Sequence, residues 1–257
     1  MSFYTGKNVL VTGAAGITGH AAVKRLLAEG ANVRATVYSN RGLKIQPHPN
    51  LEVVKCDLMK HEDCMMVLKD IDVVFNFVAF IRGAKGQTEY SNALDLVRNN
   101  LFTSINMIDA AVRSKTPLFG FIGSSTMYPD VSHPVNEDEA YNSEPHKLYR
   151  GVGWMKRYAE VQCELYAKYL PNPMTTVVIR PANLYGPHDK YDFAKCHVTP
   201  ATIRKVADNM NPIPVWGDGT ELRDLLYIDD FIEALQTVIE KQETYDVYNV
   251  GCNAVYS

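Results

Sequence analysis

Short apolar runs alternate along the chain with longer stretches of helical periodicity. Runs rich in β-branched residues predict strands at 8–12, 32–38, 51–56, 72–78, 118–123 and 175–180. Helical patterns between them are clearest at 18–30, 91–113 and 153–169. Continuous apolar runs are typical of strands buried on both faces. The pattern therefore predicts an α/β fold of Rossmann type, with a doubly wound parallel sheet covered by helices.

The regular alternation loosens after residue 181. A proline-rich stretch, "PIPVWGDGT", precedes a helical pattern at 229–241 and a short strand, "YDVYNVG". We expect an NAD(P)-binding Rossmann domain over 1–181 and a small substrate-binding lobe over 182–257. Some segments of this lobe are expected to return to the Rossmann domain. Because the chain stops soon after a strand, we also expect the lobe to be incomplete.

Composition and charge narrow the class of protein. The 257 residues are 46% hydrophobic and carry a formal net charge of −3, without a basic block. This balance argues against a general binder of nucleic acid or anionic membranes. The five cysteines are scattered and form no C-x-x-C pair, which favours reduced thiols over disulfides or a metal site. With no signal-peptide pattern and no apolar run near ~20 residues, we expect a cytoplasmic protein.

A glycine-rich turn joins the first predicted strand to the first helix. "VTGAAGITGH" places Gly13, Gly16 and Gly19 three residues apart. Glycines allow a tight turn and close approach of a pyrophosphate, which the helix N-terminus attracts. Such a motif also occurs as a mere strand–helix turn. Its place in the first strand–helix unit favours binding of a nucleotide cofactor.

The end of the second strand bears on the choice between NAD and NADP. An acidic residue there would bind the ribose hydroxyls of NAD, but the sequence reads "VYSNRG". Arg41, with Ser39 or Asn40, is suited to a 2′-phosphate, although a solvated loop arginine is the alternative. We therefore expect NADP, with NAD as the second possibility. Asp57 is suited to the adenine amino group, and Leu58 to packing on the ring.

Several motifs occur together and in order along the whole chain. They are the glycine turn, "CDL" (56–58), "SSTMYP" (124–129), Lys156, "RPANLYGP" (180–187) and "GDGTELRDLLYIDD" (217–230). This set resembles the extended short-chain dehydrogenase/reductase family of NAD(P)-dependent nucleotide-sugar epimerases, dehydratases and reductases. GDP-fucose synthase is nearest in motifs. The resemblance implies a nucleotide-diphospho-sugar substrate, with a GDP-sugar favoured, and a homodimer formed through the two long helices.

The resemblance implies a catalytic Tyr-x-x-x-Lys pair and a Ser or Thr hydroxyl. Ser124 and Lys156 match, but the residue four before the lysine is Val152, which has no proton to exchange. Tyr149, one helical turn earlier, is a candidate substitute; a packing role is the alternative reading. If Tyr149 is inactive, Ser124 through a water, or His197, would supply the proton.

Other positions are assigned by the same resemblance. Thr126 stands where the fucose synthase pattern has a cysteine, so epimerisation at C3 and C5 is not expected. Cofactor contacts are implied for Ala15, Ile17, Val78, Ala79, Arg180 and Pro181, and substrate contacts for Thr126, Asn183, His197 and Arg223. The favoured function is conversion of a nucleotide-diphospho-sugar at a C4 hydroxyl or keto group. The alternatives are an NADP-binding sensor or scaffold and, less favoured, a reductase of another carbonyl.

Overall fold

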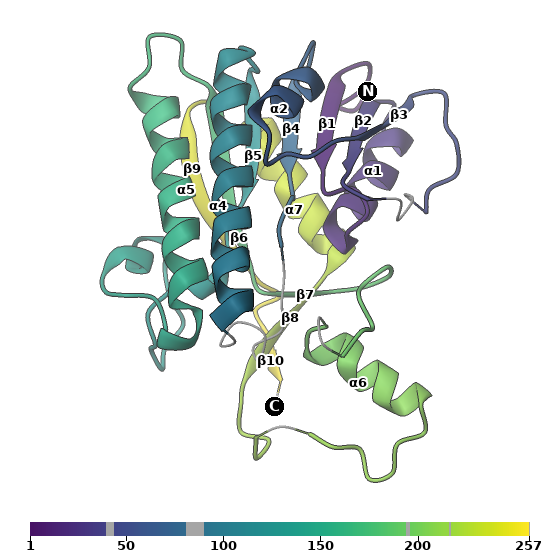
Figure 1. Cartoon of the computed structure of the whole chain (residues 1–257), viewed down its shortest axis with the longest axis vertical. Coiled ribbons are helices and arrows are strands. Elements are labelled where there is room, and N and C mark those ends of the chain that lie inside the picture. The colour runs from purple at the N-terminus through teal and green to yellow at the C-terminus, as the bar shows by residue number, and fades with distance from the viewer. Residues whose placement is uncertain (40–43, 81–89, 194–195, 216, 257) are drawn as a thin grey trace.

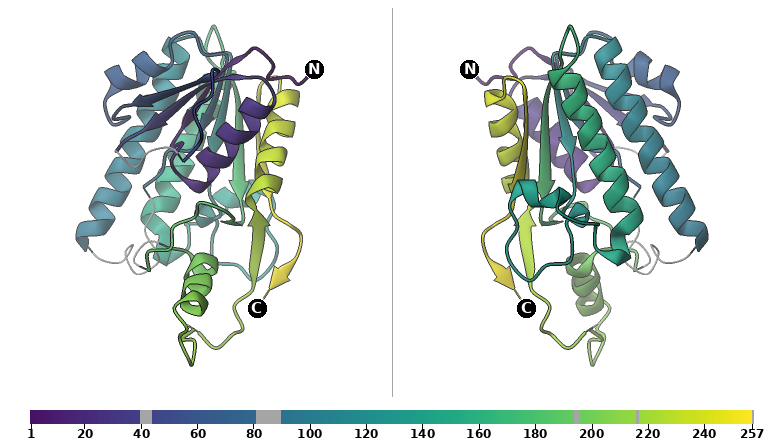
Figure 2. Two further views of the ribbon diagram at one scale, coloured as in Figure 1. Left: turned by 90° about the vertical axis from the view of Figure 1, so that its right-hand side faces the viewer. Right: turned by 90° about the vertical axis from the view of Figure 1, so that its left-hand side faces the viewer.

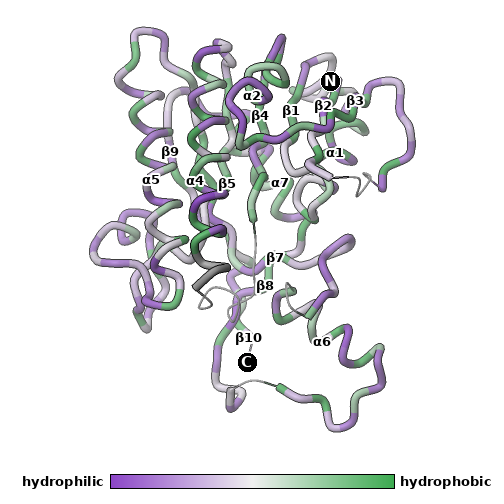
Figure 3. Tube along the Cα trace, viewed as in Figure 1, coloured by the Kyte–Doolittle hydropathy of each residue, from purple (hydrophilic) through white to green (hydrophobic). Residues whose placement is uncertain are grey.

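A computed structural model describes residues 1–39, 44–80, 90–193, 196–215 and 217–256. Within these residues, seven strands form one parallel sheet in the order β3-β2-β1-β4-β5-β6-β9. Their bounds are β1 (Asn8–Thr12), β2 (Asn32–Val37), β3 (Leu51–Lys55), β4 (Val73–Asn76), β5 (Leu118–Ile122), β6 (Thr175–Pro181) and β9 (Tyr245–Val250). The predicted Rossmann-type sheet is confirmed, and Figure 3 shows hydrophobic residues along parts of its strands.

Helices cover both faces of this sheet (Figures 1 and 2). The helices α1 (Ile17–Ala28) and α7 (Ile228–Lys241) pack together on one face. The other face is covered by α2 (His61–Val67), α4 (Tyr90–Arg113) and α5 (Arg150–Lys168). Two apolar cores result, and each lies between the sheet and one helical layer.

A smaller region lies beyond the carboxyl ends of the strands (Figure 1). It contains α6 (Val198–Ala207) and a sheet of β7 (Asn183–Tyr185), β8 (Arg223–Tyr227) and β10 (Val255–Tyr256). By contrast, β9 pairs with β6 in the large sheet, and α7 packs beside α1. Segments from the C-terminal part of the chain thus alternate between the two regions.

The start of α5 differs from the sequence prediction. The helix begins at Arg150 rather than at 153, so it includes Gly151 and Gly153. A Cβ on Gly153 would lie 2.5 Å from Cβ of Pro145, and one on Gly151 would lie 2.9 Å from Cγ2 of Val97. The two glycines therefore allow the first turn of α5 to pack closely against Pro145 and Val97.

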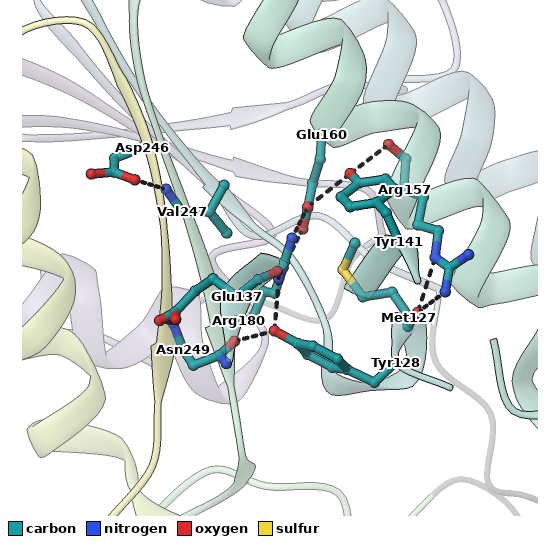
Figure 4. A network of polar contacts seen from close by, with 10 residues as sticks. All are labelled: Met127, Tyr128, Glu137, Tyr141, Arg157, Glu160, Arg180, Asp246, Val247 and Asn249. Carbon is teal, nitrogen blue, oxygen red and sulfur yellow. Dashed lines mark hydrogen bonds and ion pairs between the residues drawn. The ribbon is translucent and has the colours of Figure 1, made fainter. Parts of the chain in front are cut away.

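A buried ion pair joins α5 to the sheet (Figure 4). Nη2 of Arg180 lies 2.6 Å from Oε2 of Glu160, and the two side chains are 1% and 0% exposed. Nη1 of Arg180 also donates to the Tyr128 hydroxyl and to the Glu137 carbonyl, both at 2.7 Å. Burial opposes the charge on Arg180, but its bonds to Glu160 outweigh this effect and raise the pKa of Arg180.

The network continues from this pair to β9. The Tyr128 hydroxyl donates to Oδ1 of Asn249 at 2.6 Å, and Oε1 of Glu137 accepts from the Asn249 backbone N–H at 2.7 Å. Tyr128 follows a 3₁₀ turn, η1 (Ser125–Met127), and Glu137 opens a second one, η2 (Glu137–Tyr141). One buried cluster therefore holds α5, β6, β9 and the segment after β5 together.

Removal of the Glu160 charge tests the importance of this pair. Glu160→Gln leaves the guanidinium of Arg180 buried without its counter-ion, so we expect a loss of about 3–5 kcal/mol in the free energy of unfolding. Glu164→Gln is the matched control, because Glu164 pairs with Lys168 at the surface and should change stability by less than about 1 kcal/mol. Urea unfolding measures both. Equal losses would contradict the anchoring role of Glu160.

Candidate functional site

The glycine turn lies between β1 and α1. Gly13 has a φ of +63°, and a Cβ there would lie 3.0 Å from the Phe77 carbonyl oxygen. A Cβ on Gly19 would lie 2.4 Å from the carbonyl oxygen of Gly13. Gly16 is the N-cap of α1 and has no side chain with which to cap it. The first N–H groups of α1 are therefore available to an anion, as a pyrophosphate site requires.

A buried hydrogen bond between Thr12 and Asn76 lies next to this turn. Oγ1 of Thr12, at the end of β1, donates to Oδ1 of Asn76 at 2.8 Å. The same oxygen accepts from the backbone N–H groups of Phe77 and Val78 at 3.0 and 3.1 Å. Thr12 thereby fixes the backbone that faces Gly13. Thr12 was not predicted from the sequence, since a threonine inside an apolar strand gives no local signal of such bonds.

A groove of about 700 Å³ opens at the carboxyl ends of β2 and β3. Its lining residues are Tyr38, Ser39, Lys55, Cys56 and Asp57. Ser39 and Asp57 thus line one groove, and their contacts with a cofactor stay predictions; Asn40 and Arg41 lie outside the described residues. Leu58 is buried beside them at 6% exposure. The groove adjoins the strand ends at which a Rossmann fold binds adenosine.

Lys156 lies on the face of α5 that is turned to the sheet. Its Nζ donates to the Ile122 carbonyl at 2.7 Å and lies 4.7 Å from the centroid of the Phe121 ring. Only 7% of the residue is exposed. Burial lowers the pKa of Lys156 to about 8, although the charge of Glu160 acts in the opposite direction. The amine is therefore held at the carboxyl end of β5.

Ser124 lies two residues beyond the carbonyl that binds Lys156. Its Oγ is 2.8 Å from Oγ1 of Thr126 and accepts from the Thr126 backbone N–H at 3.2 Å. The strands β1, β4 and β5 are neighbours in the parallel sheet. The glycine turn, the Asn76–Val78 segment and the Ser124–Lys156 region therefore meet along one edge, which is where Rossmann folds bind their ligands.

Val152 and Tyr149 occupy different positions around the start of α5. Val152 is half-buried on the helix, one turn before Lys156. Tyr149 is also half-buried, but it ends a 3₁₀ turn, η3 (Lys147–Tyr149), and precedes the helix. Its ring centroid lies 5.8 Å from that of His146. The proton-transfer role of Tyr149 stays a prediction.

The predicted substrate residues lie in the smaller region. Asn183 and Arg223 are exposed on the neighbouring strands β7 and β8, and Nδ2 of Asn183 donates to the Asp224 carbonyl at 3.1 Å. His197 is the exposed N-cap residue of α6. Their contacts with a substrate stay predictions. So do the cofactor contacts of Ala15, Ile17, Val78, Ala79 and Pro181.

Arg180 has a structural position that the sequence analysis did not anticipate. It is 3% exposed, and its guanidinium binds Glu160, Tyr128 and Glu137. A contact between Arg180 and a cofactor would therefore use its backbone. The structure also stacks His20 of α1 on His188, with ring centroids 3.7 Å apart. No pattern in the sequence links these two residues.

A parallel sheet with a glycine turn between β1 and α1 defines a Rossmann protein of the nucleotide-binding class. The chain belongs to the NAD dependent epimerase/dehydratase family, whose model matches residues 9–251. This finding confirms the resemblance deduced from the motifs. Among the described residues, none of the helices combines the length and apolar character needed to cross a membrane.

Similar proteins include GDP-L-fucose synthase of Sinorhizobium fredii, which is 27% identical over 98% of this chain and 76% of the relative. GDP-mannose 3,5-epimerase of Arabidopsis thaliana is 27% identical over 97% of this chain and 66% of its own length. Several other relatives are matched over 38–65% of their length.

Solved structures with the same fold include UDP-N-acetylglucosamine 4-epimerase of Methanobrevibacter ruminantium in complex with UDP-N-acetylmuramic acid. The TM-score is 0.84 at 25% identity, over 98% of this chain and 78% of that one. The structure of MoeE5 in complex with UDP-glucose and NAD has a TM-score of 0.81 at 26% identity, over 97% of this chain and 78% of that one.

The lowered pKa of Lys156 predicts how stability depends on pH. The unfolded chain, with the ordinary lysine pKa, binds more protons than the folded protein between about pH 8 and about pH 10. The free energy of unfolding of the wild type, relative to Lys156→Met, should therefore rise by about 1–2 kcal/mol across this window. Lys168→Met removes an exposed lysine and should show no such rise. Urea unfolding at several pH values measures this; a flat difference for Lys156→Met contradicts the burial effect.

Proposed function

We propose that this chain converts a nucleotide-diphospho-sugar at a C4 hydroxyl or keto group, with NADP(H) as the hydride carrier. The observation that carries the proposal is the position of Lys156, whose buried amine binds the Ile122 carbonyl at the end of β5, two residues before Ser124. A cation at this point can hold ribose hydroxyls of the cofactor, and Ser124 can bind the oxygen that gains or loses a proton. The cofactor supplies the hydride chemistry.

A GDP-sugar is the favoured substrate. The similarity to GDP-L-fucose synthase and GDP-mannose 3,5-epimerase supports this choice. Exposed Arg223 and Asn183, on neighbouring strands, offer a cation and an amide for a diphosphate or sugar. We also propose a cytoplasmic location, which the five unpaired cysteines support. Thermal-shift and turnover screens with GDP-, UDP-, CDP- and dTDP-sugars test the substrate.

Val152 favours a second candidate, an NADP-binding sensor or scaffold that has lost the chemistry. The two candidates differ in turnover but not in binding. An enzyme changes the absorbance of NADPH, or forms a new sugar nucleotide, with at least one substrate of the screen. A chain that binds NADP(H) and a sugar nucleotide, yet converts none of them, is the sensor.

A substitution of Tyr149 tests which residue exchanges a proton with the substrate in the proposed reaction. If Tyr149 replaces the missing tyrosine, Tyr149→Phe should lower turnover by about 10²–10⁴-fold and leave cofactor affinity nearly unchanged. Tyr169→Phe is the control, since Tyr169 is 73% exposed at the C-terminal end of α5. Steady-state kinetics and NADPH titration measure the two effects. Full activity of Tyr149→Phe assigns the proton to Ser124 through a water or to His197.

We further propose that the protein is a homodimer that pairs α4 and α5. An exposed apolar stripe runs along α5 at the spacing of one helical face, formed by Trp154, Tyr158, Val161 and Leu165. Leu94 and Phe102 are exposed on α4, which packs beside it. A second copy would cover these side chains, which α4 and α5 now present to solvent.

Charges placed in the stripe should dissociate such a dimer. Tyr158→Asp combined with Leu165→Asp should give a monomer, because two carboxylates would be buried without partners. Met66→Asp, at an exposed apolar residue of α2, should leave the dimer intact. Light scattering at micromolar concentration measures the mass. A monomeric wild type would refute the pairing.

A further inference from the structure

The stacked pair of His20 and His188 joins two segments that are far apart in the sequence. His20 lies in the first turn of α1 and directly follows Gly19. His188 lies in the segment 186–193, which follows β7. The two ring centroids are 3.7 Å apart, and the ring planes are tilted by 37°. His20 is only 8% exposed, whereas His188 is exposed. The ring of His188 therefore contributes to the burial of His20.

The backbone of the segment 186–193 indicates that tertiary contacts hold it in place. His188 has a φ of +68°, in the left-handed region that costs energy for a residue with a Cβ. Gly186 has a φ of +155°, and a Cβ there would lie 2.5 Å from Cγ2 of Ile228. The start of the segment is thus packed closely against α7. The stack on His20 is a contact that can offset the backbone cost at His188.

The other end of the same segment is tied to α6. Nη1 of Arg204, on α6, donates to the Tyr191 carbonyl at 3.0 Å. The guanidinium of Arg204 also lies 5.0 Å from the centroid of the Phe193 ring. The N-cap residue of α6 is His197, one of the predicted substrate residues. The segment 186–193 therefore connects the stack on α1 to the helix that begins after His197.

The groups around His20 carry a positive charge or gain one on protonation. They are His188, Lys24 on α1 and Lys44 between β2 and β3. Burial first, and then these three groups, lower the pKa of His20. The stacked ring is therefore held neutral, and it takes up a proton more readily once the stack opens. Since a solvated histidine has a pKa of about 6.5, the stack should weaken as the pH falls below this value.

We propose that His20 and His188 are positioning residues that hold the segment 186–193 against α1, and that acidification releases this hold. The inference goes beyond the proposed reaction, because it concerns how α6 is attached to the larger region. Its consequence for the substrate rests on the proposed function. Release of the segment displaces α6 and His197, so the affinity for a sugar nucleotide should fall in acid.

Hydrogen–deuterium exchange of the whole chain tests the attachment, with protection factors corrected for the intrinsic effect of pH. In the wild type, protection of the segment 186–193 and of α6 should fall several-fold from about pH 7.5 to about pH 5.5. His20→Phe keeps an aromatic ring but has no proton to gain, so it should suppress this fall. His133→Ala, at an exposed histidine paired with Glu139, should behave as the wild type does.

Two substitutions of His188 separate the stack from other effects of this position. Because His188 is exposed, both variants should fold, and melting temperatures check this. His188→Ala removes the stack and should lower the protection of the segment several-fold already at about pH 7.5. His188→Phe provides a ring again and should restore the wild-type protection at that pH. The two variants share the left-handed backbone cost, so their difference reports on the ring alone.

The proposal is overturned if His188→Ala keeps the wild-type protection, or if acid does not change the protection of the wild type. A fall in His20→Phe as large as that in the wild type also overturns it. Calorimetric titration with GDP-mannose keeps the proposed function separate. Its dissociation constant should rise on acidification in the wild type and less in His20→Phe. If GDP-mannose does not bind, the choice of substrate fails, while the exchange results still decide whether the stack holds the segment.

Discussion

The ion pair between Glu160 and Arg180 determines how α5 is oriented against the sheet. The pair is buried, so the two charges can persist only together, with the hydroxyl and carbonyl groups around them. Glu160 is one helical turn beyond Lys156, and Val152 is one turn before it. One face of the helix is thereby directed to β5 and β6. The lysine reaches the Ile122 carbonyl because the glutamate beyond it is fixed to Arg180.

The same constraint bears on Val152, which lies one helical turn before Lys156. The first turn of α5 lies close to its neighbours, since a Cβ on Gly151 would be 2.9 Å from Cγ2 of Val97 and one on Gly153 would be 2.5 Å from Cβ of Pro145. Under the proposed enzymatic function, the proton must come from a residue other than Val152. Tyr149 meets this condition, since it belongs to the 3₁₀ turn before the helix. The glycines at the start of α5 are explained by packing, and the buried amine of Lys156 is held by its hydrogen bond to the Ile122 carbonyl.

The strands of the large sheet were predictable because each is an apolar run between turn residues. Strand β4, for example, was expected at 72–78 and is found at Val73–Asn76. The short elements α2, β7, β8 and β10 were not predicted, since segments of so few residues carry little periodicity. The positions of Ser124 and Lys156 followed from the family motif. The pairings of Arg180 with Glu160 and of His20 with His188 depend on tertiary contacts, for which the sequence has no local signal.

The burial of Lys156 bears on whether the region around Ser124 and Lys156 binds a ligand. A pKa lowered to about 8 corresponds to a cost of roughly 3 kcal/mol for keeping the amine charged at neutral pH. An apolar side chain would fill the same space without that cost. Under the proposed function, a bound group that needs this charge, such as the ribose of a cofactor, accounts for a buried lysine at this position. An enzyme and a sensor share this need. The enzyme needs a proton donor near Val152, whose own side chain cannot supply one, and the sensor does not. Whether Tyr149 donates a proton therefore decides between the two functions, and cofactor binding does not.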